Sequence, residues 1–555
     1  MIKHCILISL IFALFPFSVS ARTQLLIPVT TDTTRVTYYG TLEGYAYVGF
    51  QNSYAYTGTE PKRIVKLNRA LLGTEETSFS TAVCNSDYIC FATPEDGSMQ
   101  SVWVSDGRTI RRLGEYAGGM SHIDYMIRIG DFLNVGVISG FMHGYFVYLI
   151  HLPTGKLAFE YHGSTIGTGH LNYGSVVGNI MPINYFWWTP YASSIEYGLF
   201  DMKRFRRYTI KPNTPGASLS GVLGVFNNKY YINEYGSQVP QAVIHVWDAT
   251  KTSPTLATYA SISMGPGGAP APAQFAILGN HPVLALVYGS DIQFYDLYGA
   301  QPAAMLPSPV TVGSYVCGVP TPSSLDFFAK SGGKVRMWRF SASPPCSIRQ
   351  IGPEFDSVSP EFNIGQTMIF MASTSADGWG IWRCDQGTTV TRVCKGFTAF
   401  GSYGLASIYS DPSAPTGRLL PIGKGRYYFV ASDATHVQEP WVTDLTAAGT
   451  VKLKECDPST TKSLSGNCKV IPDSDQFVFV ARHPTSNHLE IWISDGSPRG
   501  TYSLDLVGKG FAVAGLLWAE NDRVVFLASK FGAKGSLGVY AEKIHNAARD
   551  WVDYQ

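Results

Sequence analysis

The chain has 555 residues and a formal net charge of +1, with 13% aromatic and 15% charged residues. This near-neutral balance excludes the extended basic field that nucleic-acid binding requires. The length exceeds what one ordinary hydrophobic core holds. Gly 56 and Pro 32 supply many turns, and no stretch has the sustained 3.6-residue periodicity of an amphipathic helix. The sequence therefore predicts an all-β chain.

The first predicted element is a signal peptide at residues 1–21. Ile6–Phe17 is a short apolar run, and Val19-Ser20-Ala21 has the small residues of a cleavage site. A membrane anchor is the alternative, but the run is shorter than the roughly twenty apolar residues that span a bilayer. We therefore expect a secreted, extracellular protein with no membrane span. Leu25–Val29 is expected to be a strand that hides the last sheet edge of the fold.

Tyrosine and tryptophan are concentrated in two segments of the N-terminal half. The first segment ends in Tyr54 and Tyr56, and the second contains Trp187 and Trp188. Such rings can stack on sugars or form an interface. They can equally be wedged between neighbouring sheets. These four residues are candidate interface aromatics, and the expected partners are other extracellular proteins or glycans, including further copies of the chain.

A short phrase around a tryptophan recurs along the chain. Its clearest copies are Ser101-Val-Trp-Val-Ser-Asp-Gly107, Glu439-Pro-Trp-Val-Thr-Asp444 and Glu490-Ile-Trp-Ile-Ser-Asp-Gly496, and Gly380-Ile-Trp-Arg-Cys-Asp385 is a degenerate one. In each copy a strand-like run is followed by Asp, and often Gly, which form turns. An aromatic and β-branched run typical of a buried strand precedes Trp382, Trp441 and Trp492, at 368–373, 428–432 and 477–481. We therefore expect a structural role for the residues Trp103, Asp106, Trp382, Asp385, Trp441, Asp444, Trp492 and Asp495.

The same position can be followed through eleven units. The markers are 36 to 59 residues apart: Leu67, Trp103, Tyr148, Phe200, Trp247, Tyr295, Trp338, Trp382, Trp441, Trp492 and Tyr540. A period of this size, built from two β-hairpins, is that of a propeller blade. The sequence therefore predicts a β-propeller fold with about eleven blade-like units. Only Ala541–Trp551 is expected to be helical.

The division of these units into rings depends on one segment. Residues 263–272 are rich in Gly, Pro and Ala, which is typical of a linker. One ring ordinarily has four to eight blades. We therefore expect an N-terminal propeller at 22–262 with about five units and a C-terminal propeller at 273–555 with about six. One very large ring, in which 263–272 is a long loop, is the alternative.

One basic cluster, Lys203-Arg-Phe-Arg-Arg207, interrupts this low-charge pattern. It can be a processing site for a basic-specific protease, an anion-binding patch or a solvated outer strand. The outer strand is the favoured interpretation, because the chain as a whole carries no polyanion-binding field.

Nine cysteines are present, and removal of the signal peptide leaves eight. An even number in a secreted chain predicts disulfides. Pairing of sequence neighbours would keep each bridge within one unit or at a unit boundary. Zinc is the rival ligand, but no Cys-x-x-Cys pair and no suitably spaced His is present. We therefore expect no cofactor or metal, and four local bridges: Cys84–Cys90, Cys317–Cys346, Cys384–Cys394 and Cys456–Cys468.

The copies at 439–450 and 490–501 resemble the Glu-Leu-Trp-x-Ser/Thr-Asp-Gly-Thr-x-x-Gly-Thr repeats of secreted propeller-like proteins. The match is specific over these two units and partial at 101–109, and Leu445 stands where the family has Gly. The resemblance implies an extracellular β-propeller. It transfers no catalytic residue, because the family has none in common.

No catalytic arrangement stands out in the sequence. A Gly-x-Ser-x-Gly elbow is absent, and residues 375–382 match only part of the Asp-box turn of sialidases, which is itself structural. We therefore expect a non-enzymatic extracellular structural or binding protein, for example a subunit of a cell-surface coat or appendage. The alternative is a secreted carbohydrate-active enzyme of the glycosidase or lyase type, with polar groups at the mouth of the propeller channel.

Overall fold

The computed structural model confirms the predicted all-β class, because its described residues form strands and no helix. The structure describes residues 24–28, 33–42, 45–52, 63–68, 74–78, 81–84, 88–93, 99–106, 110–118, 121–129, 131–139, 145–162, 170–173, 180–189, 192–204, 206–210, 218–235, 242–251, 256–262, 271–364, 367–385, 389–400, 419–436, 438–456, 468–472, 474–486, 488–520, 523–532 and 537–544. Within these ranges, no helix has the length and apolar character needed to cross a membrane.

The described strands form eleven sheets, which we number in chain order. Sheets 1 to 3 contain β2 (Thr33–Leu42), β3 (Tyr45–Asn52), β4 (Arg63–Asn68) and β5 (Thr74–Ser78); β6 (Thr81–Cys84), β7 (Ile89–Thr93), β8 (Met99–Ser105) and β9 (Ile110–Gly118); β10 (Ser121–Ile129), β11 (Phe132–Ser139), β12 (Tyr145–His151) and β13 (Lys156–His162). Sheets 4 and 5 contain β14 (His170–Tyr173), β15 (Ile180–Thr189), β16 (Ala192–Asp201) and β17 (Arg206–Ile210); β18 (Ser218–Phe226), β19 (Lys229–Tyr235), β20 (Ala242–Asp248) and β21 (Leu256–Ile262).

The C-terminal half continues the pattern. Sheets 6 to 8 contain β22 (Ala271–Leu278), β23 (His281–Tyr288), β24 (Asp291–Asp296), β25 (Ala303–Ala304) and β26 (Val310–Thr311); β27 (Ser314–Pro320), β28 (Ser324–Ser331), β29 (Lys334–Ser341) and β30 (Ser347–Phe355); β31 (Ser357–Ile364), β32 (Thr367–Thr374), β33 (Gly378–Cys384) and β34 (Val390–Phe397). Sheets 9 to 11 contain β35 (Ala399–Phe400), β36 (Leu420–Gly423), β37 (Arg426–Ser432), β38 (Glu439–Thr443) and β39 (Val451–Lys452); β40 (Cys468–Val470), β41 (Phe477–Arg482), β42 (Leu489–Ser494) and β43 (Tyr502–Ser503); β44 (Phe511–Glu520), β45 (Arg523–Lys530), β46 (Leu537–Lys543) and β1 (Gln24–Pro28).

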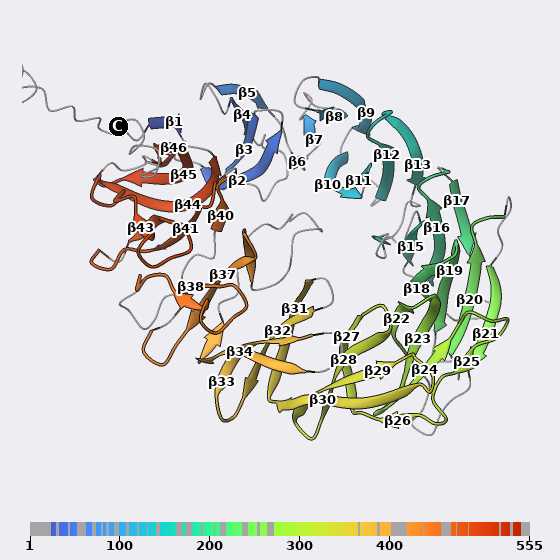
Figure 1. The fold of residues 1–555 in the computed structure, drawn as a ribbon. Coiled ribbons are helices and arrows are strands. Elements are labelled where there is room, and N and C mark those ends of the chain that lie inside the picture. Colours follow the sequence, from blue (N-terminus) through green and yellow to red (C-terminus); the bar gives the residue numbers. More distant parts are fainter. Residues whose placement is uncertain are drawn as a thin grey trace, which may run out of the picture.

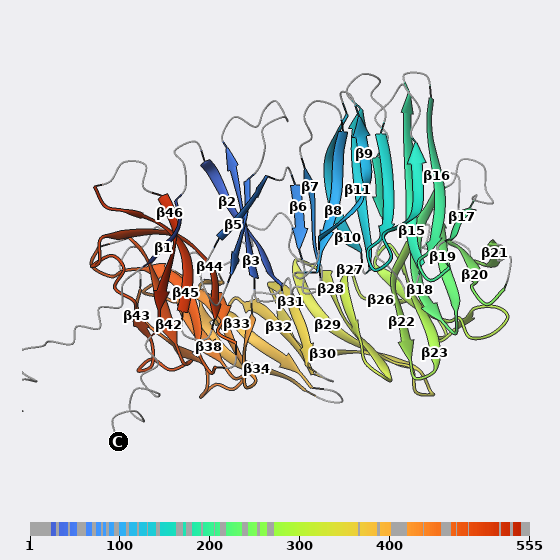
Figure 2. The same cartoon turned by 90° about the horizontal axis from the view of Figure 1, so that it is seen from above.

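Sheet 11 joins the two ends of the described chain. Its strand β1 comes from the N-terminus and pairs antiparallel with β46, with Gln24 opposite Ala541 and Leu25 opposite Tyr540. The predicted closing strand therefore pairs as expected and covers an edge of the C-terminal sheet. In both Figure 1 and Figure 2, sheet 11 lies beside sheet 1, and the other sheets follow in chain order along a curved path.

The repeat markers occupy one position in the fold. Each lies on a different sheet, in the strand next to the last: β4, β8, β12, β16, β20, β24, β29, β33, β38, β42 and β46. The preceding strand supplies an in-register partner. Phe370 lies opposite Trp382, and Phe479 lies opposite Trp492. The two phrases of the repeat are therefore the two central strands of each sheet.

Apolar side chains between successive sheets form the cores. One core combines Tyr428 and Val442 of sheet 9 with Phe477 and Phe479 of sheet 10. Another combines Phe370 of sheet 8 with residues of sheet 7. Both faces of a sheet are thus covered by its neighbours, which explains why the central strands read as almost continuous apolar runs.

Packing continues from sheet 5 to sheet 6, on either side of the predicted linker. Tyr231 of β19 and Leu284 of β23 belong to one core. The Tyr231 ring lies 5.5 Å from that of Phe275, and its hydroxyl donates a hydrogen bond of 3.3 Å to the carbonyl of Leu297. Of residues 263–272 the structure describes the last two, which open β22. Sheets 5 and 6 therefore share a core.

The predicted helix at Ala541–Trp551 is wrong where the structure describes it. Residues 541–543 end strand β46, where Ala541 lies opposite Val525 on one side and Gln24 on the other. Pairing with two neighbouring strands outweighs the weak helix preference of this segment. The rest of the predicted helix, from residue 545 onward, lies outside the described residues.

Candidate functional site

The repeat tryptophans pack against aromatic rings on the neighbouring strand of the same sheet. The rings of Trp382 and Trp492 are 7% and 4% exposed. Each is stacked on the aromatic ring opposite it, with centroids 6.5 Å apart for Trp382 and Phe370 and 6.4 Å for Trp492 and Phe479. Trp441 stacks on Phe429 in the same way at 6.3 Å, and Trp103 lies opposite Phe91. These rings supply cross-strand packing.

The repeat aspartates hold turns together in two of the clear copies. Oδ1 of Asp495 accepts hydrogen bonds from the amide and hydroxyl of Ser497, at 2.8 and 2.7 Å. Asp444 binds Thr446 in the same way at 2.9 and 2.6 Å. Asp385 differs, because it accepts from Thr367 and from its neighbour Arg383. Asp106 follows β8 directly in the first copy.

The rest of the motif also has structural reasons. The Gly that follows Asp495 has φ +84°, and Leu445 adopts φ +65° at the matching place, so this turn requires a left-handed residue. A Cβ on Gly500 would lie 2.2 Å from the Asp495 carboxylate. The buried Glu490 accepts hydrogen bonds from the amides of Ile491 and Val507, at 2.8 and 2.9 Å. The motif therefore encodes a turn and its anchors.

The candidate interface aromatics do not form a described surface. Tyr54 and Tyr56 lie outside the described residues. Trp187 and Trp188 lie in β15, opposite Ser194 and Ser193 of β16, and their side chains are not among those described.

The predicted disulfides need correction. Cys317, Cys346, Cys384, Cys394 and Cys468 are thiols, so the bridges Cys317–Cys346, Cys384–Cys394 and Cys456–Cys468 are not formed. The geometry gives the reason for two of them. Cys384 packs between sheets 7 and 8, whereas Cys394 packs between sheets 8 and 9. Cys317 and Cys346 likewise pack in different cores. Pairing by sequence proximity ignored the two faces of a sheet. For the fourth pair, the side chain of Cys84 lies outside those described.

A cleft of about 580 Å³ lies between sheets 8 and 9. One wall consists of six consecutive residues of β34, Arg392 to Phe397. The other wall comes from sheet 9 and its turns: Asp433, Trp441, Ala447 and Thr450. Successive strand residues point to opposite faces, so a cleft lined by all six follows the edge of the strand. β34 is the outer strand of sheet 8, with β33 as its partner. We call this space the sheet 8/9 cleft.

The cleft carries more cationic than anionic groups along β34. Arg392 and Lys395 both bind the single carboxylate of Asp377, the lysine at 2.8 Å. These hydrogen bonds, from Lys395 and then Arg392, hold the pKa of Asp377 below its usual value. One positive charge therefore remains uncompensated within this group of three.

On the opposite wall, Asp433 is fixed by several donors. Burial alone would raise its pKa, but hydrogen bonds from Lys452, Thr435 and the His436 amide outweigh burial and hold the pKa far below the usual range. The Lys452 ammonium lies 2.6 Å from this carboxylate and 5.6 Å from the centroid of the Trp441 ring. Asp433 is therefore ionised at neutral pH and held in place by its donors.

Cys394 also lines the cleft. Burial raises the pKa of its thiol to about 11. Because the thiolate is the nucleophilic form, Cys394 is not an activated nucleophile at neutral pH.

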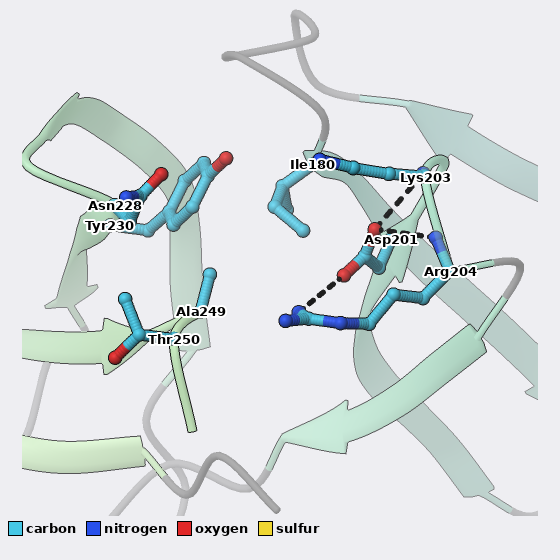
Figure 3. A pocket seen from close by; sticks show the side chains of 8 residues that line it. All are labelled: Ile180, Asp201, Lys203, Arg204, Asn228, Tyr230, Ala249 and Thr250. Carbon is cyan, nitrogen blue, oxygen red and sulfur yellow. Dashed lines mark hydrogen bonds and ion pairs between the residues drawn. The ribbon is translucent and has the colours of Figure 1, made fainter. Parts of the chain in front are cut away.

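A second, smaller pocket of about 250 Å³ lies between sheets 4 and 5 (Figure 3). Two residues of the predicted basic cluster, Lys203 and Arg204, line it in the turn after β16. Arg206 lies on the outer strand β17, as the favoured interpretation of this cluster expected, and its guanidinium lies over the ring of Tyr208. The cluster is thus divided between a pocket and an outer strand.

One acid–imidazole–hydroxyl chain crosses sheet 5. Nε2 of His245 is 2.7 Å from Glu234, and Nδ1 is 3.5 Å from the hydroxyl of Thr258. The side chains of His245 and Glu234 are both completely buried, and neither described pocket is lined by these three residues. A substrate therefore cannot reach the imidazole of His245. We assign this hydrogen-bonded series to the stability of the sheet. No group of three or more His, Cys, Asp or Glu in the described part of the chain could hold a metal ion.

No family model matches the chain. No curated protein matches it either. Solved structures do match. Dipeptidyl peptidase 4 from Porphyromonas gingivalis is 9% identical over 66% of this chain and 60% of that one, with a TM-score of 0.36. The β-propeller domain of the Trilobed protease from Pyrococcus furiosus is 8% identical over 65% and 96%, with a TM-score of 0.23. TolB from Acinetobacter baumannii is 13% identical over 60% and 77%, also at 0.23.

Several of the matched structures are peptidases, and this chain spans 55% of the length of a matched prolyl endopeptidase. This finding contradicts the prediction of a non-enzymatic structural or binding protein, which we therefore withdraw. No feature of the sequence predicted peptidase neighbours, because the repeat describes sheets and turns. All of these TM-scores are below 0.5, so no residue or role is transferred from these structures.

The sequence analysis missed Arg392 and Lys395. Neither belongs to the repeat, and basic residues on an outer strand are ordinary surface residues. Only the packing of sheet 8 against sheet 9 brings them together with Asp433 and Trp441.

Proposed function

We propose that the chain functions in peptide hydrolysis, as a propeller that binds an extended polypeptide substrate in the sheet 8/9 cleft. One observation carries the proposal: six consecutive residues at the outer edge of β34 line this cleft. An outer strand offers backbone amides and carbonyls that an extended peptide can pair with. Six strand residues extend over about 20 Å. The proposed ligand is therefore a short stretch of extended polypeptide.

The side chains of the cleft suggest which peptides fit best. Arg392 and Lys395 leave one uncompensated positive charge, and Trp441 with Ala447 offers an aromatic and aliphatic surface. A guanidinium recognises a carboxylate through paired hydrogen bonds. We therefore expect the best ligands to carry a free carboxylate next to an aromatic or apolar side chain.

Fluorescence anisotropy with labelled peptides would test this binding mode. A hexapeptide ending in Phe with a free carboxylate should bind saturably, and its C-terminal amide should bind about tenfold more weakly, as expected on losing one charge-assisted hydrogen bond. N-methylation of alternate peptide bonds should abolish binding, because it removes the donors that pair with β34. Arg392→Gln should mimic amidation. Arg349→Gln is the matched control, since Arg349 is exposed on β30, the corresponding outer strand of sheet 7, and does not line the cleft.

The hydrolytic part of the proposal needs a separate measurement. The protein purified from its own source, with whatever remains bound to it, should convert the hexapeptide into shorter products that mass spectrometry detects. Peptide binding without any cleavage would overturn this part. Equal affinity for the methylated and unmethylated peptides would overturn binding along β34.

We further propose that the eleven sheets are blades of a single large ring. The shared core of sheets 5 and 6 supports one ring over two propellers separated at 263–272, as does the position of sheet 11 beside sheet 1 (Figure 1). A protease site inserted at residue 266 would test it. After cleavage the halves should remain associated without denaturant. Two separately folded halves would support the division at 263–272.

We also propose that the chain is exported and belongs with the secreted propeller-like proteins that its repeats resemble. The apolar run and cleavage site at 1–21 support export. N-terminal sequencing of the native protein should begin at Arg22. A mature protein that retains Met1 would argue against export by this route.

A further inference from the structure

The pocket between sheets 4 and 5, which we call the sheet 4/5 pocket, differs from the other repeat turns in its charge. After their Asp, the turns of sheets 9 and 10 have the small hydroxyl residues Thr446 and Ser497. At the corresponding turn of sheet 4, Lys203 stands two residues after Asp201, where Thr446 and Ser497 stand in the other turns, and Arg204 follows it. The turn itself is preserved, because Asp201 accepts hydrogen bonds of 3.0 Å from the amides of both residues. These hydrogen bonds use only the backbone amides of Lys203 and Arg204, so their charged side chains are not required for the turn.

Both cations project into the pocket. In Figure 3, Lys203 and Arg204 reach from sheet 4 toward Tyr230, Ala249 and Thr250 of sheet 5. The Arg204 guanidinium is held at 3.0 Å by the nearly buried carboxylate of Asp201, which fixes its orientation. No hydrogen bond or ion pair is recorded for the Lys203 ammonium among the described residues. The lining side chains therefore carry two positive charges and one negative charge.

The opposite wall of the pocket, from sheet 5, is polar and is held in place by its own hydrogen bonds. Asn228 lies in the β18–β19 turn with φ +60°, and its carbonyl accepts a hydrogen bond of 3.0 Å from the Ala249 amide. The hydroxyl of Thr250 donates to Asp248 at 2.6 Å and so presents only its lone pairs to other groups. The side-chain amide of Asn228 lines the pocket beside Tyr230. The cationic donors therefore come from sheet 4, and sheet 5 supplies a polar opposite wall.

We propose that the sheet 4/5 pocket binds a tetrahedral oxyanion, a phosphate or sulfate group, between Lys203 and Arg204. Charge favours an anion, and two separate cationic side chains suit a group with several acceptor oxygens better than a planar carboxylate. The volume of about 250 Å³ leaves room for a small organic group attached to the oxyanion. Such a ligand would bridge two neighbouring sheets far along the chain from the sheet 8/9 cleft. This inference does not depend on the proposed peptide function.

Isothermal titration calorimetry of the full-length protein at constant ionic strength tests the proposal. The probes are inorganic phosphate, inorganic sulfate, a hexose 6-phosphate and acetate. Phosphate or sulfate should bind saturably with one ion per chain, and acetate more weakly. Lys203→Met should weaken oxyanion binding at least about tenfold, the loss expected for one charge-assisted hydrogen bond. Lys156→Met, which removes an exposed charge from sheet 3 outside the pocket, should leave the affinity within about twofold.

The two sources of the group are distinguished in the same series. Tighter binding of the hexose phosphate than of inorganic phosphate identifies a phosphate monoester as the ligand, and the reverse order identifies a free ion. At the same concentration, bound phosphate should also raise the unfolding temperature of the wild-type protein more than that of Lys203→Met. Absence of saturable binding for every oxyanion, or equal affinities in the wild type and Lys203→Met, overturns the proposal.

Discussion

The turn of the repeat can be tested by adding one methyl group at Gly500. A Cβ at this position would lie 2.2 Å from Cγ and both carboxylate oxygens of Asp495. The carboxylate must then move and give up its two hydrogen bonds from Ser497. Hydrogen bonds to a charged acceptor contribute roughly 1.5–3 kcal/mol each when buried, and less where water can replace them. Gly→Ala by itself stabilises by about 0.4–1 kcal/mol through the unfolded chain. We therefore expect Gly500→Ala to cost about 2 kcal/mol.

Three further variants isolate this cause: Gly515→Ala, Asp495→Ala and the double variant with Gly500→Ala. Gly515 in β44 has no atom within 4 Å of the position of a Cβ and no positive φ, so Gly515→Ala should be neutral or slightly stabilising. In an Asp495→Ala background the clash partner is missing, so Gly500→Ala should cost little. Urea unfolding of the wild type, Gly500→Ala, Asp495→Ala and the double variant completes a double-mutant cycle. Amide hydrogen exchange at residues 497–501 reports the turn locally. Additive effects of Gly500→Ala and Asp495→Ala, or a cost equal to that of Gly515→Ala, would refute the reasoning.

Three other outcomes are expected. Trp492→Ala should cost about 3–5 kcal/mol in urea unfolding, because a buried ring stacked on Phe479 is lost; a cost below about 1 kcal/mol would mean that the ring is available for binding. The pKa of Asp433 is lowered on folding, so its contribution is present above the unfolded value of about 3.9 and is lost as the pH falls toward the folded value. Asp433→Asn should therefore lower stability at pH 7 and flatten the acid decline below about pH 4, and an unchanged pH profile would contradict the assignment. Alkylation without reductant should label Cys317, Cys384, Cys394 and Cys468 only after denaturation, because burial raises the thiol pKa of Cys317 and Cys394 to about 11, of Cys384 to about 12 and that of Cys468 further still; protection that persists in denaturant would indicate disulfides.

The sheets could be predicted from the sequence because each repeats the same local requirements. A buried aromatic strand, a second strand with a central ring, and an Asp turn recur at fixed order, so position along the chain is enough to find them. Leu67 and Phe200 lie on the marker strand even though their own segments lack the Trp phrase. Spacing therefore located the units where the motif itself had been lost.

Features that depend on the face of a sheet could not be predicted in this way. Cys384 and Cys394 are ten positions apart, yet they pack in cores on opposite sides of sheet 8. Their orientation depends on a register that is irregular between β33 and β34, on either side of Ile381. Irregular register changes which side chains face which neighbour. Sequence spacing contains no record of such irregularities.

The cationic residues of the candidate sites do not belong to the repeat. In the copy at 490–501 the conspicuous residues are occupied: Trp492 by stacking, Asp495 and Glu490 by backbone amides, and Gly500 by close approach. Residues so committed cannot bind a ligand without loss of the turn or core they maintain. Charged recognition must therefore use side chains that the repeat does not require, and in the two described pockets these lie where sheets meet, beside the repeat residue Trp441 in the sheet 8/9 cleft. Arg392 and Lys395 meet this condition in the sheet 8/9 cleft, and Lys203 meets it in the sheet 4/5 pocket. In this chain the departures from the repeat are a better guide to function than the repeat itself.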